Sequence, residues 1–327
     1  MTMTPGSSPR PPSAPSKSAE ALRLRSLGLS NKQVAAVLDV PVPSARRLIS
    51  EAKRVGHEGH ALEILEKAMP GFGAAYSQRA HKKPTHVFIP DPQCAPDTPL
   101  EHLRWAGQYI KEHGADVIVN AGDHWDLPSL SSYEGKGSKY FEGKRYLSDV
   151  AAGNKGLELF EEGLGGFAPQ RKVILRGNHE FRGDRAVNED PKLEGLIGEH
   201  LFNDVALGWT PVPFLHPIEI DQLWYSHYWV QPNTGRAYSG TVENMIKNIG
   251  FSFVAGHQQG LRYARRELSN GKVQVGLVAG SFYQVPQSYR GPQATNEWCG
   301  IIVMHEVGGG DYNLMQISMD YLRRKFS

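Results

Sequence analysis

Residues 116–124 read DVIVNAGDH, an apolar run that ends in a glycine and then a carboxylate, and this stretch decides the fold. Residues 173–180, VILRGNHE, show the same order with an amide and a histidine after the glycine. Short apolar runs bounded by glycine or proline are typical of buried strands. We therefore predict buried strands at 116–121 and 173–176, and further ones at 86–90, 223–226 and 251–255.

Polar side chains of the kinds that bind metals follow each of these runs directly. They are Asp91 and Gln93, Asp123, Asn178 with His179 and Glu180, His227, and His257 with Gln259. In open α/β sheets the carboxyl ends of the strands are where ligands gather, so these turns are expected to converge on one crevice. Glycines at 122, 177 and 256 precede three of the groups, where a strand must turn sharply.

Helical stretches alternate with these runs and are expected at 100–113, 148–162, 191–201 and 241–249. Alternation of strand and helix indicates an α/β domain with a partly parallel sheet and helices on its faces. The segment 273–322 differs, because short apolar runs are interrupted by glycines at 308–310. We expect it to add antiparallel strands at an edge.

The N-terminal part has a different character. Residues 1–17 are rich in Pro and Ser and predict a disordered tail. Residues 18–55 show apolar side chains at helical spacing and predict three short helices, with Ser30 capping the second and the third beginning near Ser44. A linker is expected at 56–84, before a main domain at 85–327.

The stretch from Gly28 to Leu48 resembles a helix-turn-helix of the resolvase or sigma-like kind. That resemblance implies a last helix in the DNA major groove, with Ser44, Arg46 and Arg47 facing phosphates or base edges. The alternative is a small helical hairpin that packs on the main domain or on a second copy. Helix-turn-helix units often act in pairs, so a homodimer is possible.

Composition and charge restrict the partners. The chain has 40% hydrophobic residues and a net charge of +2. Residues 1–60 hold 9 Lys+Arg against 4 Asp+Glu, so the basic excess is N-terminal and permits contact with a polyanion. The two cysteines cannot form a disulfide framework, and we find neither an apolar run of membrane-spanning length nor a secretory signal. We expect a cytoplasmic protein without membrane contact.

The order Asp-x-Gln, Gly-Asp, Gly-Asn-His-Glu, His and Gly-His-x-Gln resembles the five motifs of calcineurin-like metallophosphoesterases, over about residues 85–260. The resemblance implies that family's sandwich of mixed sheets flanked by helices, and a pair of divalent ions bridged by Asp123. Asp91, Gln93 and Gln259 would complete the first metal site, and Asn178, His227 and His257 the second. His179 would contact the phosphate and protonate the leaving oxygen.

Gln93 and Gln259 stand where the family most often has histidine. Glutamine offers a neutral amide oxygen in place of an imidazole nitrogen, which favours harder ions such as Mn²⁺ or Mg²⁺ over Zn²⁺. We therefore expect two Mn²⁺ ions, with Mg²⁺, Fe or Zn as alternatives.

Substrate contacts are expected from the loop at 127–146, which interleaves Tyr and Phe with Lys139 and Arg145. Such a mixture suits a substrate that carries a phosphate and a stacking base, and equally a solvated loop. Arg176 could reach the phosphate or simply end its strand.

The sequence thus predicts a two-metal phosphoesterase that hydrolyses a phosphodiester, with DNA favoured by the helix-turn-helix resemblance. A nuclease or DNA-end processing enzyme would follow, and the domain pairing suggests a bacterial or bacteriophage source. Two alternatives stay open. One is a phosphoesterase acting on nucleotides or pyrophosphates, and the other is a DNA-binding or assembly protein that retains a degenerate phosphoesterase scaffold.

Overall fold

The computed structural model describes residues 17–26, 30–54, 83–132, 137–284 and 297–327 of the chain. The chain divides into two compact units, Met1–Lys82 and Lys83–Ser327. The predicted tail lies outside the described residues except for Lys17, and so does the predicted linker except for Lys83 and Pro84.

Three helices make up the described part of the N-terminal unit: α1 (Lys17–Ser26), α2 (Asn31–Val37) and α3 (Val42–Arg54). The predicted cap at Ser30 is confirmed. Its Oγ accepts a hydrogen bond from the backbone N–H of Gln33, and Gln33 Oε1 accepts one from the backbone N–H of Ser30. This reciprocal pair satisfies two amides at the helix start. Helix α3 begins two residues before the predicted Ser44, because proline at position 43 is compatible with a first helical turn.

Apolar side chains from all three helices form a small core of their own. Its buried members are Ala21, Leu24, Val34, Ala35, Ala45 and Ile49. Val37 lies outside this core and is 58% exposed. On α3, Arg46 and Arg47 are exposed and Ser44 is half-buried, so the face beside Ala45 presents two cations to solvent.

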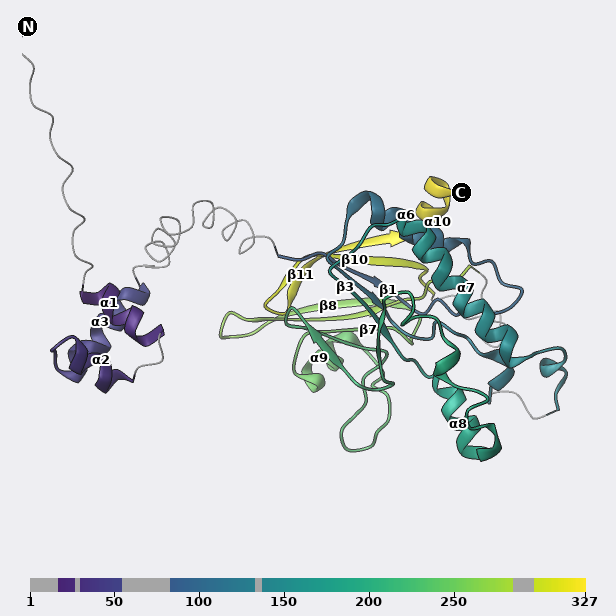
Figure 1. Cartoon of the computed structure of the whole chain (residues 1–327), viewed down its shortest axis with the longest axis horizontal. Helices are drawn as coiled ribbons and strands as arrows, with labels where there is room; N and C mark the ends of the chain where they lie inside the picture. The colour runs from purple at the N-terminus through teal and green to yellow at the C-terminus, as the bar shows by residue number, and fades with distance from the viewer. Residues whose placement is uncertain (1–16, 27–29, 55–82, 133–136, 285–296) are drawn as a thin grey trace, which may run out of the picture. The chain divides into compact units, whose positions relative to one another are not determined.

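The strands of the Lys83–Ser327 unit form two mixed sheets within the described residues (Figure 1). The first has the order β11–β10–β1–β2–β3–β4, with β1 to β4 parallel and β10 and β11 antiparallel. The second has the order β5–β6–β7–β9–β8, with β6, β7 and β9 parallel. The strand bounds are β1 His86–Ile89, β2 Val117–Asn120, β3 Arg171–Leu175, β4 Thr210–Val212, β5 Ile218–Ile220, β6 Leu223–Ser226, β7 Phe253–Ala255, β8 Leu261–Glu267, β9 Val273–Ala279, β10 Gly300–Gly308 and β11 Asp311–Ser318.

The two sheets pack face to face, and helices cover their outer faces (Figure 1). Alternation along β1 shows the layering: Phe88 enters the core between the sheets, while Val87 and Ile89 enter the core under the helices. Helices α6 (Glu101–His113), α7 (Tyr146–Leu164) and α10 (Met319–Phe326) cover the first sheet, and α9 (Val242–Ile249) covers the second. The α/β class with mixed sheets flanked by helices is therefore confirmed.

The prediction of secondary structure was wrong in one place and incomplete in another. A helix was expected at 191–201, but the structure has two short 3₁₀ turns, Pro191–Leu193 and Glu199–Leu201, because Gly195 and Gly198 with φ of 75° and 142° interrupt the segment. Helix α8 (Phe181–Glu189) was not predicted. Further 3₁₀ turns lie at Pro128–Leu130 and Lys139–Phe141. The expected antiparallel edge is present as β10 and β11, whereas β9 lies inside the second sheet.

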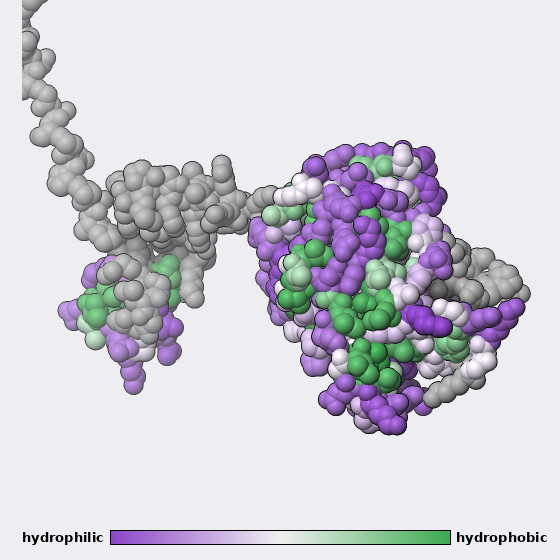
Figure 2. All heavy atoms as spheres, turned by 45° about the vertical axis from the view of Figure 1, so that its right-hand side comes forward, coloured by the Kyte–Doolittle hydropathy of each residue, from purple (hydrophilic) through white to green (hydrophobic). Residues whose placement is uncertain are grey.

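The described surface of this unit carries both hydrophilic and hydrophobic side chains. Figure 2 shows one face, on which hydrophobic side chains form patches among hydrophilic ones. Leu147, Leu196 and Val205 are each more than 60% exposed, and isolated apolar side chains of this kind are normal on soluble domains. Among the described helices, none has the length and apolar character needed to cross a membrane.

Helices α6 and α7 approach so closely that backbone meets backbone. A Cβ on Gly163 would lie 2.2 Å from the Arg104 carbonyl oxygen, and one on Gly107 would lie 2.3 Å from that of Phe160. Glycine is required at this crossing because no side chain fits, and the crossing fixes the layer that covers the first sheet.

We expect Gly163→Ala to lower the free energy of unfolding by about 1–3 kcal/mol, because the added methyl forces the two helices apart. The matched control is Gly183→Ala in α8, where a Cβ meets no atom within 4 Å and helix propensity should add about 0.5–1 kcal/mol. All six tryptophans lie in the Lys83–Ser327 unit, so urea unfolding followed by tryptophan fluorescence measures this unit alone. Equal stability of the two variants would contradict the close-contact argument.

Candidate metal centre

Five strand ends bring the predicted ligands to one place. Asp91 and Gln93 follow β1, Asp123 follows β2, Asn178 follows β3, His227 follows β6, and His257 and Gln259 follow β7. The parallel strands of both sheets therefore end at a shared edge. The ring of His227 joins the two sheets there, since its Nδ1 donates to the Ala121 carbonyl at 2.9 Å.

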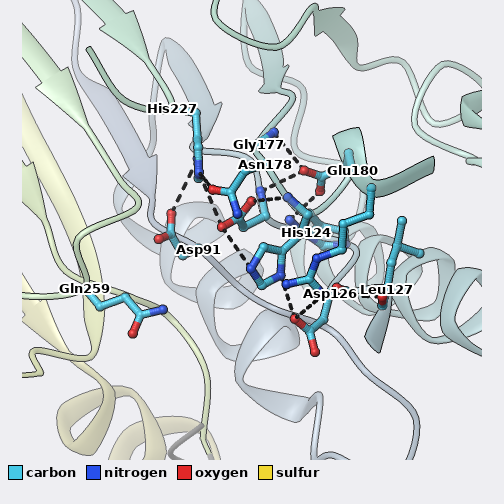
Figure 3. A network of polar contacts seen from close by, with 12 residues as sticks. Asp91, His124, Asp126, Leu127, Gly177, Asn178, Glu180, His227 and Gln259 are labelled. Carbon is cyan, nitrogen blue, oxygen red and sulfur yellow. Dashed lines mark hydrogen bonds and ion pairs between the residues drawn. The ribbon is translucent and has the colours of Figure 1, made fainter. Parts of the chain in front are cut away.

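This hydrogen bond fixes which nitrogen of His227 faces the site. With Nδ1 bound to a backbone carbonyl, Nε2 lies 3.1 Å from Asn178 Oδ1 and 3.3 Å from Asp123 Oδ2 (Figure 3). An imidazole held by a backbone carbonyl at one nitrogen and open at the other is a common arrangement of metal-binding histidines. One potential ligand atom each from Asp123, His227 and His257 lie within 4.8 Å of one another. These Asp and His residues form a cluster that could bind a metal ion.

Asp91 is the least satisfied member of the group. Its side chain is fully buried, and neither carboxylate oxygen has a well-formed hydrogen bond among the described residues, with only a weak contact from the His257 backbone amide. The nearest cationic group is His227, whose Nδ1 lies 3.9 Å from Oδ1. Burial raises the pKa of Asp91 well above its usual range, and His227 only partly opposes this. A buried carboxylate without a well-formed hydrogen bond is costly, and a cation at this position would remove the cost.

The two glutamines differ in their surroundings. Gln93 is buried, and its backbone N–H donates to the Asp123 carbonyl at 2.8 Å. This hydrogen bond ties the first two ligand loops together. Gln259 is also buried, but its Oε1 accepts a hydrogen bond from Tyr283 Oη at 3.1 Å. In Figure 3 the Gln259 side chain stands apart from His227 and Asn178. The structure thus brings Gln259 to the edge of the group and pairs it with a tyrosine.

Electrostatics link Asp123 to the surrounding histidines. Burial alone would favour the neutral acid, but His179 and His227 hold the pKa of Asp123 well below its usual range. Burial would likewise lower the pKa of His227, yet Asp123 and Asp91 raise it to about 9. His257, farther from the carboxylates and close to His227, has its pKa lowered to about 4 by burial. The group holds a proton at His227 that a metal would have to displace.

Backbone strain gathers at the same residues. Five of the seven predicted ligands have positive φ: Asp91 (35°), Gln93 (45°), Asp123 (49°), His257 (65°) and Gln259 (57°). Non-glycine residues rarely adopt this conformation, which costs about 1–3 kcal/mol each, and such residues cluster at functional sites. The backbone conformation at these residues therefore positions their side chains at a cost in folding stability.

The glycines before the ligands make room for carboxylates from other strands. A Cβ on Gly177 would lie 2.1 Å from Asp123 Oδ1, and a Cβ on Gly256 would lie 2.3 Å from Asp91 Oδ1. Gly122 has a φ of 91°, which glycine alone adopts without strain. Each carboxylate is thus seated against the backbone of the neighbouring loop, as the sharp turns expected at these glycines require.

Glu180 holds two of the ligand loops in register. Its Oε2 accepts hydrogen bonds from the amides of Asp123 (3.0 Å) and Gly177 (2.8 Å). Its Oε1 accepts from the amides of His124 (2.7 Å) and Trp125 (3.0 Å). Burial raises the pKa of this carboxyl and Asp123 adds to the rise, while Arg176 and the backbone amides oppose it. Four donors on one buried carboxylate lock the turn after β2 to the turn after β3 (Figure 3).

His179 lies beside the cluster and is oriented by a residue that sequence analysis missed. Its Nδ1 is 2.6 Å from Asp126 Oδ1, its backbone amide donates to Asp123 Oδ1 at 2.9 Å, and its Nε2 is 3.7 Å from Asp123 Oδ2. Asp126 is in turn held by Arg182, whose Nη1 donates to the Asp126 carbonyl at 2.7 Å. The spacing of three residues between Asp123 and Asp126 was a visible signal that a second carboxylate belongs to this turn.

Other predicted contacts lie away from the cluster. Arg176 is buried and pairs with Glu199 at 2.8 Å and Asp204 at 2.5 Å, which favours its role as a strand end over contact with a phosphate. Lys139 and Arg145 are exposed, and neither bonds to a predicted ligand in the described part of the chain.

His124, although adjacent to Asp123, has a structural role. It is fully buried, and Nε2 donates to the Gly153 carbonyl at 2.9 Å while Nδ1 lies 3.1 Å from Asn120 Nδ2. Burial lowers its pKa to about 4. The neutral imidazole therefore fastens the turn to helix α7.

A scan of the chain against protein-family models gives no match, and a search of curated proteins gives none either.

We expect Glu180→Gln to lower the free energy of unfolding by about 2–3 kcal/mol and to weaken Mn²⁺ binding, because the amide NH₂ would face two backbone N–H donors. Urea unfolding and isothermal titration with Mn²⁺ measure the two effects. Glu158→Gln on the exposed side of α7 removes the same charge and should change stability by less than about 0.5 kcal/mol. Unchanged metal affinity in Glu180→Gln would show that the loop register does not depend on this carboxylate.

Proposed function

We propose that the Lys83–Ser327 unit is a metal-dependent phosphoesterase of the calcineurin-like metallophosphoesterase family, and that it hydrolyses a phosphodiester in nucleic acid. The observation that carries the proposal is the buried Asp91 carboxylate without a well-formed hydrogen bond, beside Asp123, Asn178, His227 and His257 at the shared edge of the sheets. Buried carboxylates facing histidines and an amide oxygen form a donor set for divalent cations.

The donor set would hold two divalent ions if Asp123 is shared between them, as the family resemblance implies. Asp91, Gln93 and Gln259 would complete the first site, and Asn178, His227 and His257 the second. Oxygen ligands from Asp91, Gln93 and Asn178 favour Mn²⁺, with Mg²⁺, Fe or Zn as alternatives. When bound, such ions supply positive charge to the phosphoryl oxygens and lower the pKa of an attacking water.

The residues of the chain orient the reaction. Asp126 accepts the Nδ1–H of His179 and thereby holds Nε2 facing the Asp123 carboxylate. From there Nε2 can donate a proton to the leaving oxygen of a phosphate held at the cluster, or stabilise the charge that develops on it. Asp126 is thus a positioning residue, and His179 the proposed general acid.

Nucleic acid is the preferred substrate because of the N-terminal unit. Arg46 and Arg47 are exposed next to each other on α3, in a stretch that resembles a helix-turn-helix. Cations on the last helix of such a unit can contact DNA phosphates. The Gln259–Tyr283 hydrogen bond favours a second candidate, a DNA-binding protein with a degenerate phosphoesterase scaffold, because it occupies one predicted ligand oxygen.

The test is hydrolysis of bis-p-nitrophenyl phosphate and of single- and double-stranded DNA with Mn²⁺, Mg²⁺ or EDTA. We expect turnover with Mn²⁺, none with EDTA, and none in Asp123→Ala. Turnover of nucleotides or pyrophosphates but not of DNA would replace the substrate class. Failure of folded protein to hydrolyse any of these would leave the scaffold function.

We expect Asp126→Asn to lower kcat about 10- to 100-fold with little change in KM, because His179 loses the carboxylate that orients it. His179→Ala should lower kcat about 10²- to 10⁴-fold, and the double variant should be no worse than His179→Ala alone. Asp320→Asn, an exposed carboxylate on α10, is the charge control. Additive losses in the double variant would contradict a positioning role.

We expect the pair Arg46→Ala and Arg47→Ala to weaken DNA binding and to lower the slope of log K against log salt by about 2, since each phosphate contact contributes about 0.9. Hydrolysis of bis-p-nitrophenyl phosphate should be unchanged. The control pair, Arg25→Ala with Lys32→Ala, removes the same charge from exposed positions on α1 and α2. An equal effect of both pairs in fluorescence anisotropy would mean that net charge, not α3, mediates binding.

A further inference from the structure

A pocket of ≈ 460 Å³ lies between helix α8 and the segment that begins with the 3₁₀ turn Pro128–Leu130. A volume of this size is typical of small-molecule sites. Within the described residues it is lined by both apolar and charged side chains. Those that bear on its chemistry are Leu130, Phe141, Arg182, Arg185 and Glu189.

Hydrogen bonds through Asp126 link one side chain of the pocket lining to His179. Arg182, which lines the pocket, donates from Nη1 to the carbonyls of Asp126 (2.7 Å) and Leu127 (3.3 Å). Asp126 is the residue whose carboxylate holds His179. Figure 3 shows Asp126 and Leu127 on the side of the network away from Asp91 and His227. The lining of the pocket is therefore linked to His179 through Asp126, on the Nδ1 side of the imidazole ring.

Its charged groups suit an anion. Arg182 is only 4% exposed, and only Nη1 of its guanidinium has a hydrogen-bond acceptor among the described residues. Arg185, one turn farther along α8, is exposed and bonds weakly to Ser132 Oγ at 3.4 Å. Among the described lining residues, Glu189 is the one carboxylate beside the two guanidinium groups. Guanidinium groups arranged in this way recognise phosphate.

Its remaining surface suits a nucleoside. Phe141 and Leu130 provide apolar contact, and aromatic faces bind nucleobases without preference for sequence. A phosphate-binding end next to an apolar wall matches a nucleotide better than a simple anion.

We propose that this pocket binds a nucleotide of the substrate next to the scissile bond, with its further phosphate at Arg185 and Arg182 and its base or sugar against Phe141 and Leu130. The proposal rests on the proposed function, because the nucleotide belongs to a phosphodiester held at the metal centre. Discrimination among phosphodiesters then comes from this site, one nucleotide away from the scissile bond.

The experiment compares thymidine dinucleotides that carry no terminal phosphate, a 5′-phosphate or a 3′-phosphate with bis-p-nitrophenyl phosphate, all with the full chain and Mn²⁺. We expect one of the two phosphorylated dinucleotides to show a KM about 10-fold below that of the unphosphorylated one, since a charge-assisted contact is worth about this factor. Which end is preferred shows on which side of the scissile bond the pocket lies.

Arg185→Gln should abolish that difference and leave bis-p-nitrophenyl phosphate unaffected, whereas Arg185→Lys should keep part of it. Phe141→Ala should raise KM for every dinucleotide, with or without the terminal phosphate. Arg266→Gln, an exposed arginine on β8 that does not line the pocket, is the matched control.

The outcomes separate this proposal from the function on which it rests. Turnover with the same KM for all three dinucleotides in wild type and Arg185→Gln would overturn the pocket and retain the phosphoesterase. Absence of turnover would overturn the phosphoesterase. In that case, dinucleotide binding in isothermal titration that Arg185→Gln removes would keep the pocket as a nucleotide site, and binding that the variant leaves intact would overturn it too.

Discussion

The buried Glu180 carboxylate is the interaction on which the rest of the site depends. Four backbone amides converge on its oxygens, and they belong to the two loops that carry Asp123, Asn178 and His179. Strand pairing places β2 beside β3, but it specifies the loops that follow only loosely. The charge-assisted hydrogen bonds to Glu180 fix the conformation of these loops. Such bonds are strong, and when buried they are all formed in only one arrangement of the loops.

The strand ends could be read from the sequence because burial on both faces demands continuous apolar runs, and these runs stop where polar side chains begin. That logic located Asp91, Asp123, Asn178, His227 and His257 together. It could not locate Asp126 or Arg182, which matter through contacts between a loop and α8, nor could it assign Arg176 to Glu199 and Asp204. Such pairings depend on tertiary placement, which spacing along the chain does not encode.

The segment after Asn178 illustrates the same limit for secondary structure. Helix α8 contains few apolar residues, and its buried Arg182 bonds to the Asp126 and Leu127 carbonyls, a tertiary contact that the local sequence does not reveal. The next segment looked helical by composition, yet Gly195 and Gly198 in positive φ end any continuous helix. Local pattern decided the sheets, whereas tertiary context and glycine decided the connections.

Gly177 and Gly256 are each coupled to a carboxylate of the site. Each accommodates the carboxylate of a residue far away in the chain, Asp123 for one and Asp91 for the other, in the volume where its own side chain would be. A side chain at either glycine would displace the carboxylate that faces it, so the site would lose that ligand although the ligand residue itself is unchanged. Each glycine and the carboxylate seated against it therefore form one functional unit, although they lie far apart in the chain.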